Sequence, residues 1–444
     1  MNQNVLELYE FGVAFGEKII LTSVNLQLSD RGVNVLVGPA GTGKSTLLRT
    51  ITGLNDANPS LRTWGKAFYA GKPLGHADIP VLVAQNTKLM LASVLENVLH
   101  DLPERRSLSK LQQVDVGKRL LVHSGLEELV SDLEKSVVDL PLHLQRHLAI
   151  ARSVAANPKV LCLDEPTTGL EEQHSEKLIQ YIIQEAKRRA ILIVVHNQNH
   201  ARMLGGSVAL LAGGWIHEIG KTEQFLIAPI SEAAKAFVRT GSCDVPSPNV
   251  KAEELSEEAL SKYDPPPMHS NANNYISDAF GPRNFLWLKK GMLAGTPRPG
   301  LLTEIEYDMK ALKRVGITVL VNLTRTPFDK DVLKEYNITG IFFPITDMSS
   351  PDIEDAKMLC RRVSRLMQKG EVVAMHCKAG LGRTGTMLAA SLIWEGQTAL
   401  EALENIRKIE PRWVQSDEQV SFLEKFAESL RKNGGALNNT AAYL

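Results

Sequence analysis

The stretch GVNVLVGPAGTGKSTLLRTI at residues 32–51 decides the fold of the first half of the chain. It begins with an apolar run typical of a buried parallel strand and ends in a helix-forming run. Between them lies a loop with the spacing GxxxxGK(S/T), made of Gly38, Pro39, Ala40, Gly41, Thr42, Gly43, Lys44 and Ser45, with Thr46 directly after it. In such a loop backbone N–H groups point at a phosphate, the lysine reaches its oxygens and the serine hydroxyl binds Mg²⁺. The stretch therefore predicts a site for ATP and Mg²⁺.

A second apolar run, KVLCLDE at residues 159–165, ends in two acids. In nucleotide-binding α/β proteins a carboxylate at the end of a nearby strand joins the metal site, and another residue acts on the attacking water. We therefore expect Asp164 to bind the Mg²⁺ together with Ser45, and Glu165 to polarise the water.

Both halves of the chain alternate strand-type runs with helical ones, which indicates α/β domains. The strand-type runs lie at 32–38, 159–165 and 190–196 in the first half and at 317–323, 339–345 and 372–377 in the second. The stretch between the halves is acidic and contains three consecutive prolines, as linkers often do. We expect an α/β domain at 1–240, a linker at 241–275, an α/β domain at 276–430 and a flexible tail at 431–444.

The composition excludes several classes of protein. The chain has 444 residues with 50 basic and 50 acidic side chains, and neither half is basic enough to favour nucleic acid as a partner. No apolar run is long enough to cross a membrane and no signal-peptide pattern is present, so we expect a cytoplasmic protein. The four cysteines show no CxxC spacing, which argues against a zinc site or a disulfide framework.

The order of motifs over residues 3–230 resembles that of an ATP-binding-cassette (ABC) ATPase. The phosphate loop is followed by Gln85 after an apolar run, by a helical insert that opens with SVLENVL at 93–99, by AIAR before LCLDEPTTGL, and by His196 after LIVV. The segment 207–226 is similar to the ATPase subunits of phosphate importers. The resemblance implies a P-loop fold with a helical insert, a dimer and a transmembrane permease partner.

The same resemblance implies roles for three further residues. Phe15 would stack on the adenine, and His196 would contact the γ-phosphate as a switch. Gln85 would reach the Mg²⁺ and the γ-phosphate and couple the site to the permease. From the residues alone, Phe15 and Gln85 also fit an ordinary core residue and an ordinary loop residue.

The segment LPLHL at residues 140–144 departs from the cassette pattern. The family has LSGGQ there, and its serine hydroxyl and glycine amides cap the ATP of the dimer partner. Pro141 offers neither an N–H nor a hydroxyl, and the leucine side chains obstruct a close approach. We expect weak ATP hydrolysis in a homodimer, whereas a heterodimer with a complete ATPase would contain one good composite site.

The second half contains its own phosphate loop, HCKAGLGRTG at residues 376–385, between an apolar run and a helical run. Its spacing is Cys-x5-Arg, from Cys377 to Arg383. The amide N–H groups of such a loop favour a thiolate and bind a phosphoryl dianion, while the arginine grips two phosphate oxygens. Gly380 and Gly382 permit the tight turn. The pattern predicts a phosphatase that works through a phosphocysteine intermediate.

Hydrolysis of a phosphate ester also needs a proton donor for the leaving oxygen and a base for the water. We expect Asp347, in the loop PITDM, to take both roles. Asp352 and Asp355 are the alternatives, although SSPDIED is typical of a helix start. Thr384 is expected to steady the sulfur as a leaving group, and His376 to orient the loop through hydrogen bonds.

Residues 280–428 resemble a small atypical dual-specificity protein phosphatase. The resemblance is carried by FGPRNFLWLKKGMLAGTPRP at 280–299, by the cysteine loop and by RKIEPRWVQSDEQVSFL at 407–423. It implies a mixed central sheet, no cofactor for this domain, and a role for Gln419 in positioning the hydrolytic water. Arg412-Trp413 stands where the family usually has glycine and serine.

The substrate of this second site is left open by the residues. Lipid-directed relatives share HCKAG but commonly carry a second lysine where this chain has Leu381. A deep pocket would select phosphotyrosine, and a shallow one would admit phosphoserine and phosphothreonine. Cys360 is a candidate for a protective disulfide with Cys377, although a buried helix cysteine is the simpler interpretation.

Three functions fit these patterns. We favour a bifunctional ABC ATPase and cysteine phosphatase that acts on a phosphoprotein and is regulated by ATP. The second is the energising ATPase of an anion importer with an accessory phosphatase, held at the inner face of the plasma membrane by a permease. The third is an ATP-binding dimerisation scaffold without turnover.

Overall fold

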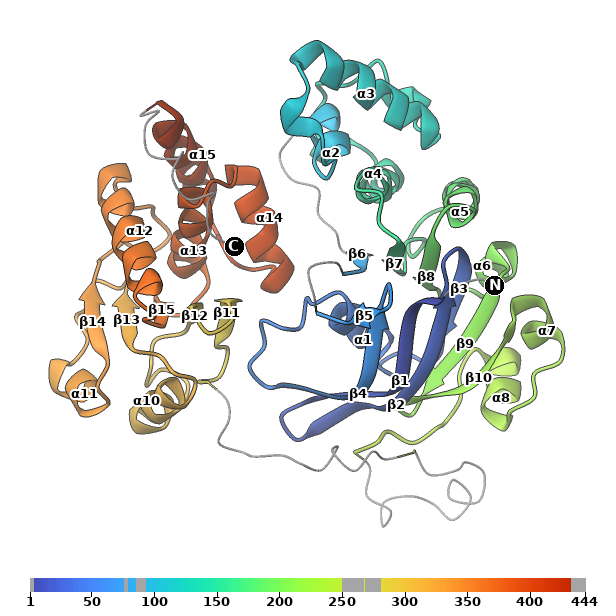
Figure 1. The fold of residues 1–444 in the computed structure, drawn as a ribbon, viewed down its shortest axis with the longest axis horizontal. Helices are drawn as coiled ribbons and strands as arrows, with labels where there is room; N and C mark the ends of the chain where they lie inside the picture. The colour runs from blue at the N-terminus through green and yellow to red at the C-terminus, as the bar shows by residue number, and fades with distance from the viewer. Residues whose placement is uncertain (1–3, 76–78, 85–92, 250–266, 268–280, 433–444) are drawn as a thin grey trace. The chain divides into compact units, whose positions relative to one another are not determined.

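The computed structural model describes residues 4–75, 79–84, 93–249, 267 and 281–432 (Figure 1). The chain divides into two compact units, one of residues 1–53 and 62–275 and the other of residues 54–61 and 276–444. Most of the expected linker and nearly all of the expected tail lie outside the described residues. None of the helices in the described ranges is long and apolar enough to cross a membrane.

The first unit is built on one mixed sheet, whose described strands follow the order β5-β4-β1-β2-β10-β9-β3-β8-β7-β6. The segment from β9 to β6 is parallel, whereas β1 with β2 and β9 with β10 are antiparallel. Every residue of β7 and β8 is buried, as expected for parallel strands with both faces covered. The strands are β1 (Asn4–Phe15), β2 (Lys18–Ser29), β3 (Gly32–Val37), β4 (Leu61–Tyr69), β5 (Lys72–Pro73), β6 (Val81–Val83), β7 (Val160–Asp164), β8 (Ala190–Val194), β9 (Ser207–Ala212) and β10 (Trp215–Lys221).

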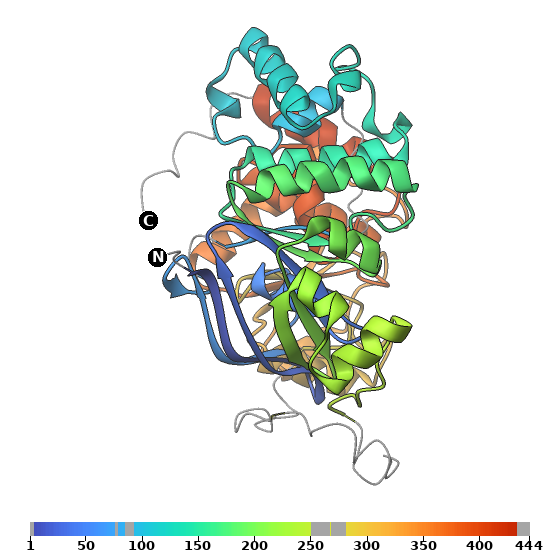
Figure 2. The same ribbon diagram turned by 90° about the vertical axis from the view of Figure 1, so that its right-hand side faces the viewer.

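Helices of the first unit cover this sheet and form a helical insert between β6 and β7. In the insert α2 packs on α3 and α4, and α4 lies beside α5 (Figures 1 and 2). Both α2 and α3 begin with a capping box, formed by Ser93 with Glu96 and by Ser109 with Gln112. The helices are α1 (Lys44–Ile51), α2 (Val94–Leu99), α3 (Lys110–His123), α4 (Leu142–Ala155), α5 (Glu172–Ala186), α6 (Gln198–Leu204), α7 (Thr222–Ile227) and α8 (Glu232–Thr240).

The second unit has a five-stranded sheet among its described residues, in the order β11-β12-β15-β13-β14. Only the pairing of β11 with β12 is antiparallel, and the other three described pairings are parallel. The strands are β11 (Leu286–Lys289), β12 (Leu293–Thr296), β13 (Val319–Asn322), β14 (Thr339–Phe342) and β15 (Val373–His376). The sheet is therefore mixed, as the resemblance implied.

A buried helix organises the second unit. α13 (Gly382–Trp394) contacts α12, α14 and α15 as well as β12 and β15, and all but its last residue are buried (Figure 1). The other helices are α10 (Ile305–Arg314), α11 (Lys330–Glu335), α12 (Ile353–Gln368), α14 (Ala399–Ile409) and α15 (Asp417–Lys432). The expectation of α/β architecture in both halves, with a helical insert in the first and a mixed sheet in the second, is confirmed.

Two candidate active sites

The glycines of the first phosphate loop lie where other residues do not fit. The loop joins β3 to α1, as the sequence predicted. Gly38 has a φ of +150°, and a Cβ there would lie 2.0 Å from the carbonyl oxygen of Leu211. Gly43, directly before α1, has a φ of +98°, which strains any residue with a side chain. The glycines thus allow the tight turn that places backbone N–H groups at the start of α1.

Lys44 is held inside its own loop. Its Nζ donates to the carbonyl oxygens of Gly38 at 2.8 Å and Pro39 at 2.7 Å. Burial lowers the pKa of the Lys44 ammonium, while the charges of Glu165 and Asp164 oppose that shift. The ammonium is therefore placed where the phosphates of a nucleotide would lie and is close to both acids.

Ser45 and Asp164 are brought together at the end of β7. Burial raises the pKa of the Asp164 carboxyl, and a hydrogen bond from the Ser45 side chain opposes the shift. The Oδ1 atom of Asp164 is buried and has no hydrogen-bond partner in the described part of the chain. A hydroxyl and a carboxylate oxygen without a partner are the hard oxygen ligands that Mg²⁺ prefers, so the residues present fit that ion.

Glu165 and His196 form a pair at the ends of β7 and β8. His196 Nε2 lies 2.5 Å from Glu165 Oε1, and the Thr168 hydroxyl donates to Glu165 Oε2 at 3.3 Å. Glu165 has a φ of +51°, and its N–H donates to the carbonyl of Val194 at 3.1 Å. Neighbouring parallel strands thus bring together two residues that the sequence had placed on separate motifs.

Two further residues, Phe15 and Gln85, were expected at the nucleotide. Phe15 is half-buried at the end of β1, opposite Lys18 in the hairpin to β2, and its role on the adenine stays a prediction. Gln85 lies outside the described residues.

The LPLHL segment serves the packing of the helical insert. Leu140 and Leu144 are 5% and 7% exposed and belong to the main core, while Pro141 precedes the first turn of α4. His143 stacks on His174 of α5, with ring centroids 3.6 Å apart. The N-cap of α4 is Pro141 and makes no side-chain cap hydrogen bond, and the segment contains no serine or glycine.

The cysteine loop lies between β15 and α13 and is supported from outside its own motif. The carbonyl of Lys378 accepts from the N–H of Arg298 at 3.1 Å, and the carbonyl of Gly380 accepts from Trp413 Nε1 at 3.0 Å. In a trans peptide unit the C=O and the N–H point in opposite directions. Because both carbonyls point outward to their donors, the N–H group that follows each of them in the chain points into the loop. Gly380 has a φ of +77°, and a Cβ there would be 2.7 Å from Pro297 N.

Arg383 is fixed at the start of α13 by the loop that follows β14. Its Nη1 donates to the Ile345 carbonyl at 3.0 Å, and its Nη2 lies 2.8 Å from Asp347 Oδ1. The Arg383 side chain is 6% exposed and that of Asp347 is 73% exposed. Asp352, by contrast, caps α12 by accepting from the N–H groups of Glu354 and Asp355. The structure therefore places Asp347, rather than its two alternatives, beside the predicted phosphate-binding arginine.

Three more predicted residues surround the loop. His376 is buried, its Nδ1 lies 3.2 Å from the Cys377 carbonyl, and burial lowers the pKa of its imidazole to about 4. A histidine that stays neutral near pH 7 suits a positioning role. The Thr384 hydroxyl is buried without a hydrogen-bond partner among the described residues. Gln419 is fully buried, and its Oε1 accepts from the N–H of Gln415 at 2.9 Å.

The four cysteines are free thiols. Cys377 is 3% exposed directly after β15. Cys360 is 1% exposed on α12, and burial raises the pKa of its thiol to about 12. Ser391 of α13 and Glu395, directly after that helix, act on the same thiol. This is the environment of a structural cysteine, in line with the simpler interpretation.

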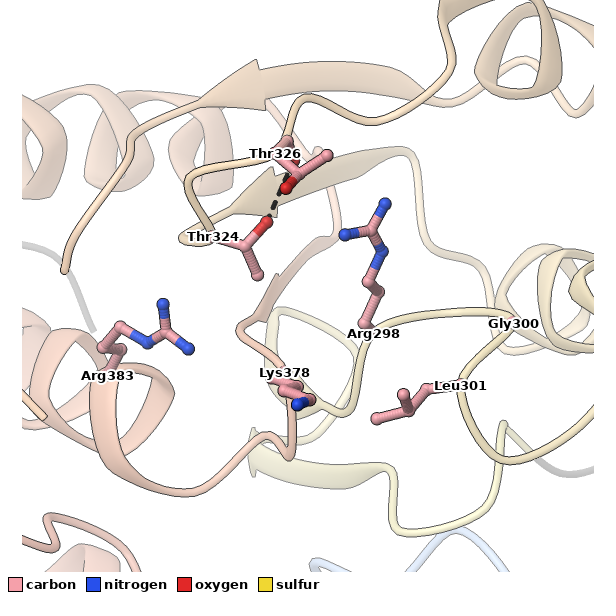
Figure 3. Close-up of a pocket in the computed structure, with 7 residues that line it drawn as sticks. All are labelled: Arg298, Gly300, Leu301, Thr324, Thr326, Lys378 and Arg383. Carbon is pink, nitrogen blue, oxygen red and sulfur yellow. Dashed lines mark hydrogen bonds between the residues drawn. The ribbon is translucent and has the colours of Figure 1, made fainter. Parts of the chain in front are cut away.

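A cavity of 440 Å³ opens beside the cysteine loop (Figure 3). Residues from four segments line it: Arg298, Gly300, Leu301, Thr324, Thr326, Lys378 and Arg383. Sequence reasoning missed Arg298 and the two threonines, because no motif spacing connects them to the cysteine. It also left Trp413 as an unexplained departure, although a tryptophan where the family usually has a small residue was a usable signal.

The folds and sites define a P-loop ATP-binding unit followed by a cysteine-loop phosphatase unit, and comparisons with known proteins agree. Residues 21–168 match the family model "ABC transporter", and residues 294–397 match "Polymorphic toxin system, DSP-PTPase phosphatase". The chain belongs to the ABC transporter family through its first unit, and its second unit carries a DSP-PTPase phosphatase domain.

The relatives cover the first unit. The chain is 29% identical to "Phosphate import ATP-binding protein PstB 2" of Bacillus licheniformis over 53% of this chain and 89% of that protein. It is 30% identical to the protein of the same name from Bacillus subtilis, over 53% of this chain and 91% of that protein. Among solved structures, it resembles cbiO1 from Clostridium perfringens at 22% identity and a TM-score of 0.45, covering 54% of this chain and 96% of that one.

Proposed function

We propose that this chain is an ATP-binding protein whose second unit hydrolyses phosphate monoesters of a phosphoprotein through a phosphocysteine intermediate. The observation that carries the proposal is the convergence of Arg383, Asp347 and the cysteine loop, with the arginine 2.8 Å from the acid. The family match to a DSP-PTPase phosphatase over residues 294–397 supports it.

The chemistry follows from these residues. The Cys377 thiolate attacks phosphorus while the loop amides and Arg383 bind the three non-bridging oxygens. The bond from phosphorus to the leaving oxygen breaks, and Asp347 gives that oxygen its proton. Water then attacks the phosphocysteine, its proton passes to the Asp347 carboxylate, and the P–S bond breaks to release orthophosphate. Thr384 steadies the departing sulfur, and Gln419 orients the water.

In the first unit, Lys44 and the loop amides would bind the phosphates of ATP, and Ser45 and Asp164 would hold Mg²⁺, with Gln85 as a further ligand. A bound Mg²⁺ supplies charge neutralisation on the phosphates. Glu165 would orient the attacking water, with His196 at the γ-phosphate and Phe15 on the adenine. We propose that hydrolysis is weak in a homodimer, because the start of α4 lacks the signature's donors.

ATP control of the phosphatase is the regulatory part of the proposal. The segment that leaves the first unit is tied to the nucleotide site: Asn249 Oδ1 accepts from Ile19 N–H at 2.9 Å, and its Nδ2 donates to the Ile19 carbonyl at 2.7 Å. Ile19 pairs with Ala14, beside Phe15. Cys243 of the same segment is buried. A change at this hairpin on nucleotide binding would therefore be transmitted through Asn249 to the segment that leads to the phosphatase unit.

A single assay tests the proposal. Hydrolysis of an aryl phosphate is measured with and without ATP for the wild type, Cys377→Ser and Lys44→Ala. We expect no turnover in Cys377→Ser, and an ATP effect in the wild type that Lys44→Ala removes. Absence of hydrolysis by the wild type would refute the phosphatase, whereas hydrolysis that ignores ATP would refute the regulation alone.

An alternative rests on the relatives, which are named as phosphate import ATP-binding proteins. On this alternative the first unit energises an anion importer with a transmembrane permease partner, and the protein works at the cytoplasmic face of the membrane. Co-purification of the full chain with a membrane-spanning partner would favour it.

A further inference from the structure

Exposed apolar side chains lie at the rim of the cavity beside the cysteine loop. Leu301 lines the cavity and is 43% exposed, and Leu302 directly after it is 48% exposed. Ile305, the first residue of α10, is 37% exposed. Figure 3 shows Leu301 on the loop after β12, across from Lys378 of the cysteine loop. Single apolar residues are common on protein surfaces, but a group of them beside a binding site indicates contact with a ligand or a partner. We call Leu301, Leu302 and Ile305 the apolar rim.

Hydrogen bonds on both sides of the two leucines fix the loop that carries them. Buried Asp308 of α10 accepts from the Gly300 N–H at 2.9 Å and from the Thr303 hydroxyl. Gly300 has a φ of +79°, and a Cβ there would lie 3.0 Å from the Cβ of Ile305. The loop therefore turns tightly against the start of α10. A loop held in this way keeps its leucines exposed to a ligand without a further cost in backbone ordering.

Another exposed apolar residue lies next to the proposed catalytic acid. Met348 directly follows Asp347 and is 50% exposed. Its φ is +62°, which is uncommon for a residue with a side chain, and its carbonyl accepts from the Ser416 hydroxyl at 2.7 Å. Such backbone strain is concentrated at functional sites, where the surrounding structure maintains it. Because Arg383 pairs with Asp347 and also lines the cavity with Leu301, Met348 and the apolar rim belong to one site.

A polypeptide substrate explains why apolar residues from two loops surround one phosphate site. The chain continues on both sides of a phosphorylated residue, so the neighbouring side chains reach the surface around the cavity. A free phosphate monoester small enough for the 440 Å³ cavity would leave that surface in water. A membrane is disfavoured, because the exposed Glu304 and Glu306 lie among these apolar residues in the sequence, where membrane-binding surfaces have Lys and Arg.

We infer that the apolar rim and Met348 bind large apolar side chains that flank the phosphorylated residue of a substrate protein. The inference rests on the proposed phosphatase function and specifies its substrate class. The cysteine loop and Arg383 bind the phosphate, and the two exposed apolar surfaces select the sequence around it.

Matched peptides test the inference in the full chain. Two pairs are compared, one built on phosphotyrosine and one on phosphoserine. In each pair the residues directly before and after the phosphorylated one are leucine in one member and glutamine in the other, so that length and charge are the same. We expect the leucine member of at least one pair to have a kcat/KM about tenfold higher or more, the effect of burying a leucine side chain.

Variants of the exposed apolar residues connect this preference to the structure. Leu302→Gln and Met348→Gln should each lower the ratio of the two kcat/KM values. The ratio is internal to each variant, so a general loss of activity does not change it. Met358→Gln is the matched control, because it removes an apolar side chain that is 64% exposed on α12, and it should keep the ratio of the wild type.

Three results would overturn the inference. The first is an equal kcat/KM for the two members of both pairs, or a ratio that Leu302→Gln and Met348→Gln leave unchanged. The second is hydrolysis of p-nitrophenyl phosphate without hydrolysis of any of the peptides. The third is co-sedimentation with vesicles of phosphatidylcholine and phosphatidylserine that Leu302→Gln abolishes, because the leucine would then contact a membrane. Failure of the proposed function is distinct, since no Cys377-dependent hydrolysis would then occur with any substrate, p-nitrophenyl phosphate included.

Discussion

Replacing Trp413 with phenylalanine tests whether the cysteine loop depends on a support from outside its motif. Trp413 is 1% exposed, and its Nε1–H is the donor to the Gly380 carbonyl. Glycines make room for the indole, since a Cβ on Gly385 would lie 2.7 Å from the Trp413 Cβ and one on Gly295 would lie 3.1 Å from its Cζ2. Phenylalanine keeps most of the aromatic packing and removes the donor.

The expected loss of stability follows from the Gly380 carbonyl, which stays buried after its donor is removed. A buried carbonyl without a partner costs about 1–3 kcal/mol, a large part of the roughly 5–15 kcal/mol that stabilises a typical domain. The carbonyl belongs to the loop whose amides must bind the phosphate. Misplacement of that loop is expected to lower kcat/KM on the order of tenfold or more.

Two measurements on the full chain decide the matter: urea unfolding followed by far-UV circular dichroism, and kcat/KM for an aryl phosphate. Trp394→Phe is the matched control, because Trp394 is half-buried at the far end of α13 and the same indole is lost. We expect the control to keep the rate of the wild type. Wild-type stability and rate in Trp413→Phe would refute the idea that the indole supports the loop.

Three further predictions follow from the two sites. Asp347→Asn should lower kcat on the order of 10²-fold or more for an alkyl phosphate, but less for p-nitrophenyl phosphate, whose leaving group needs little protonation. The control Asp352→Asn keeps a helix cap and should leave both rates unchanged. Equal losses of kcat for both substrates in Asp347→Asn would contradict the role of Asp347. Because burial lowers the pKa of His376 from 6.5 to about 4, the unfolded state binds more protons between these values. The second unit should therefore be fully stable above about pH 6.5 and lose up to about 3 kcal/mol as the pH falls towards 4, and His376→Gln should flatten this dependence in urea titrations at several pH values. Glu165→Gln should retain ATP binding, measured by equilibrium dialysis, and lose the weak ATP hydrolysis of the wild type. Unchanged ATP hydrolysis would contradict a role for Glu165 in the reaction.

Local patterns predicted much of the fold and of both sites. The phosphate loop and the cysteine loop each lie within about ten consecutive residues between a strand and a helix, so short-range spacing is enough to identify them. The pairing of Arg383 with Asp347 could be predicted in part, because an acid after another parallel strand of the same sheet comes to the same edge of the sheet as the cysteine loop. The choice against Asp352 was likewise visible, since a proline and acids mark a helix start.

Other features required the tertiary structure. The sequence by itself determined the two α/β units and the two phosphate loops and predicted the residues of their chemistry, since these depend on backbone conformation and local spacing. Only the tertiary structure decided that Trp413 and Arg298 hold the cysteine loop by its carbonyls, that Glu165 pairs with His196, and that Arg298 and Lys378 share a cavity with Arg383. Contacts between distant segments depend on strand order and helix packing, and no spacing within one motif contains that information.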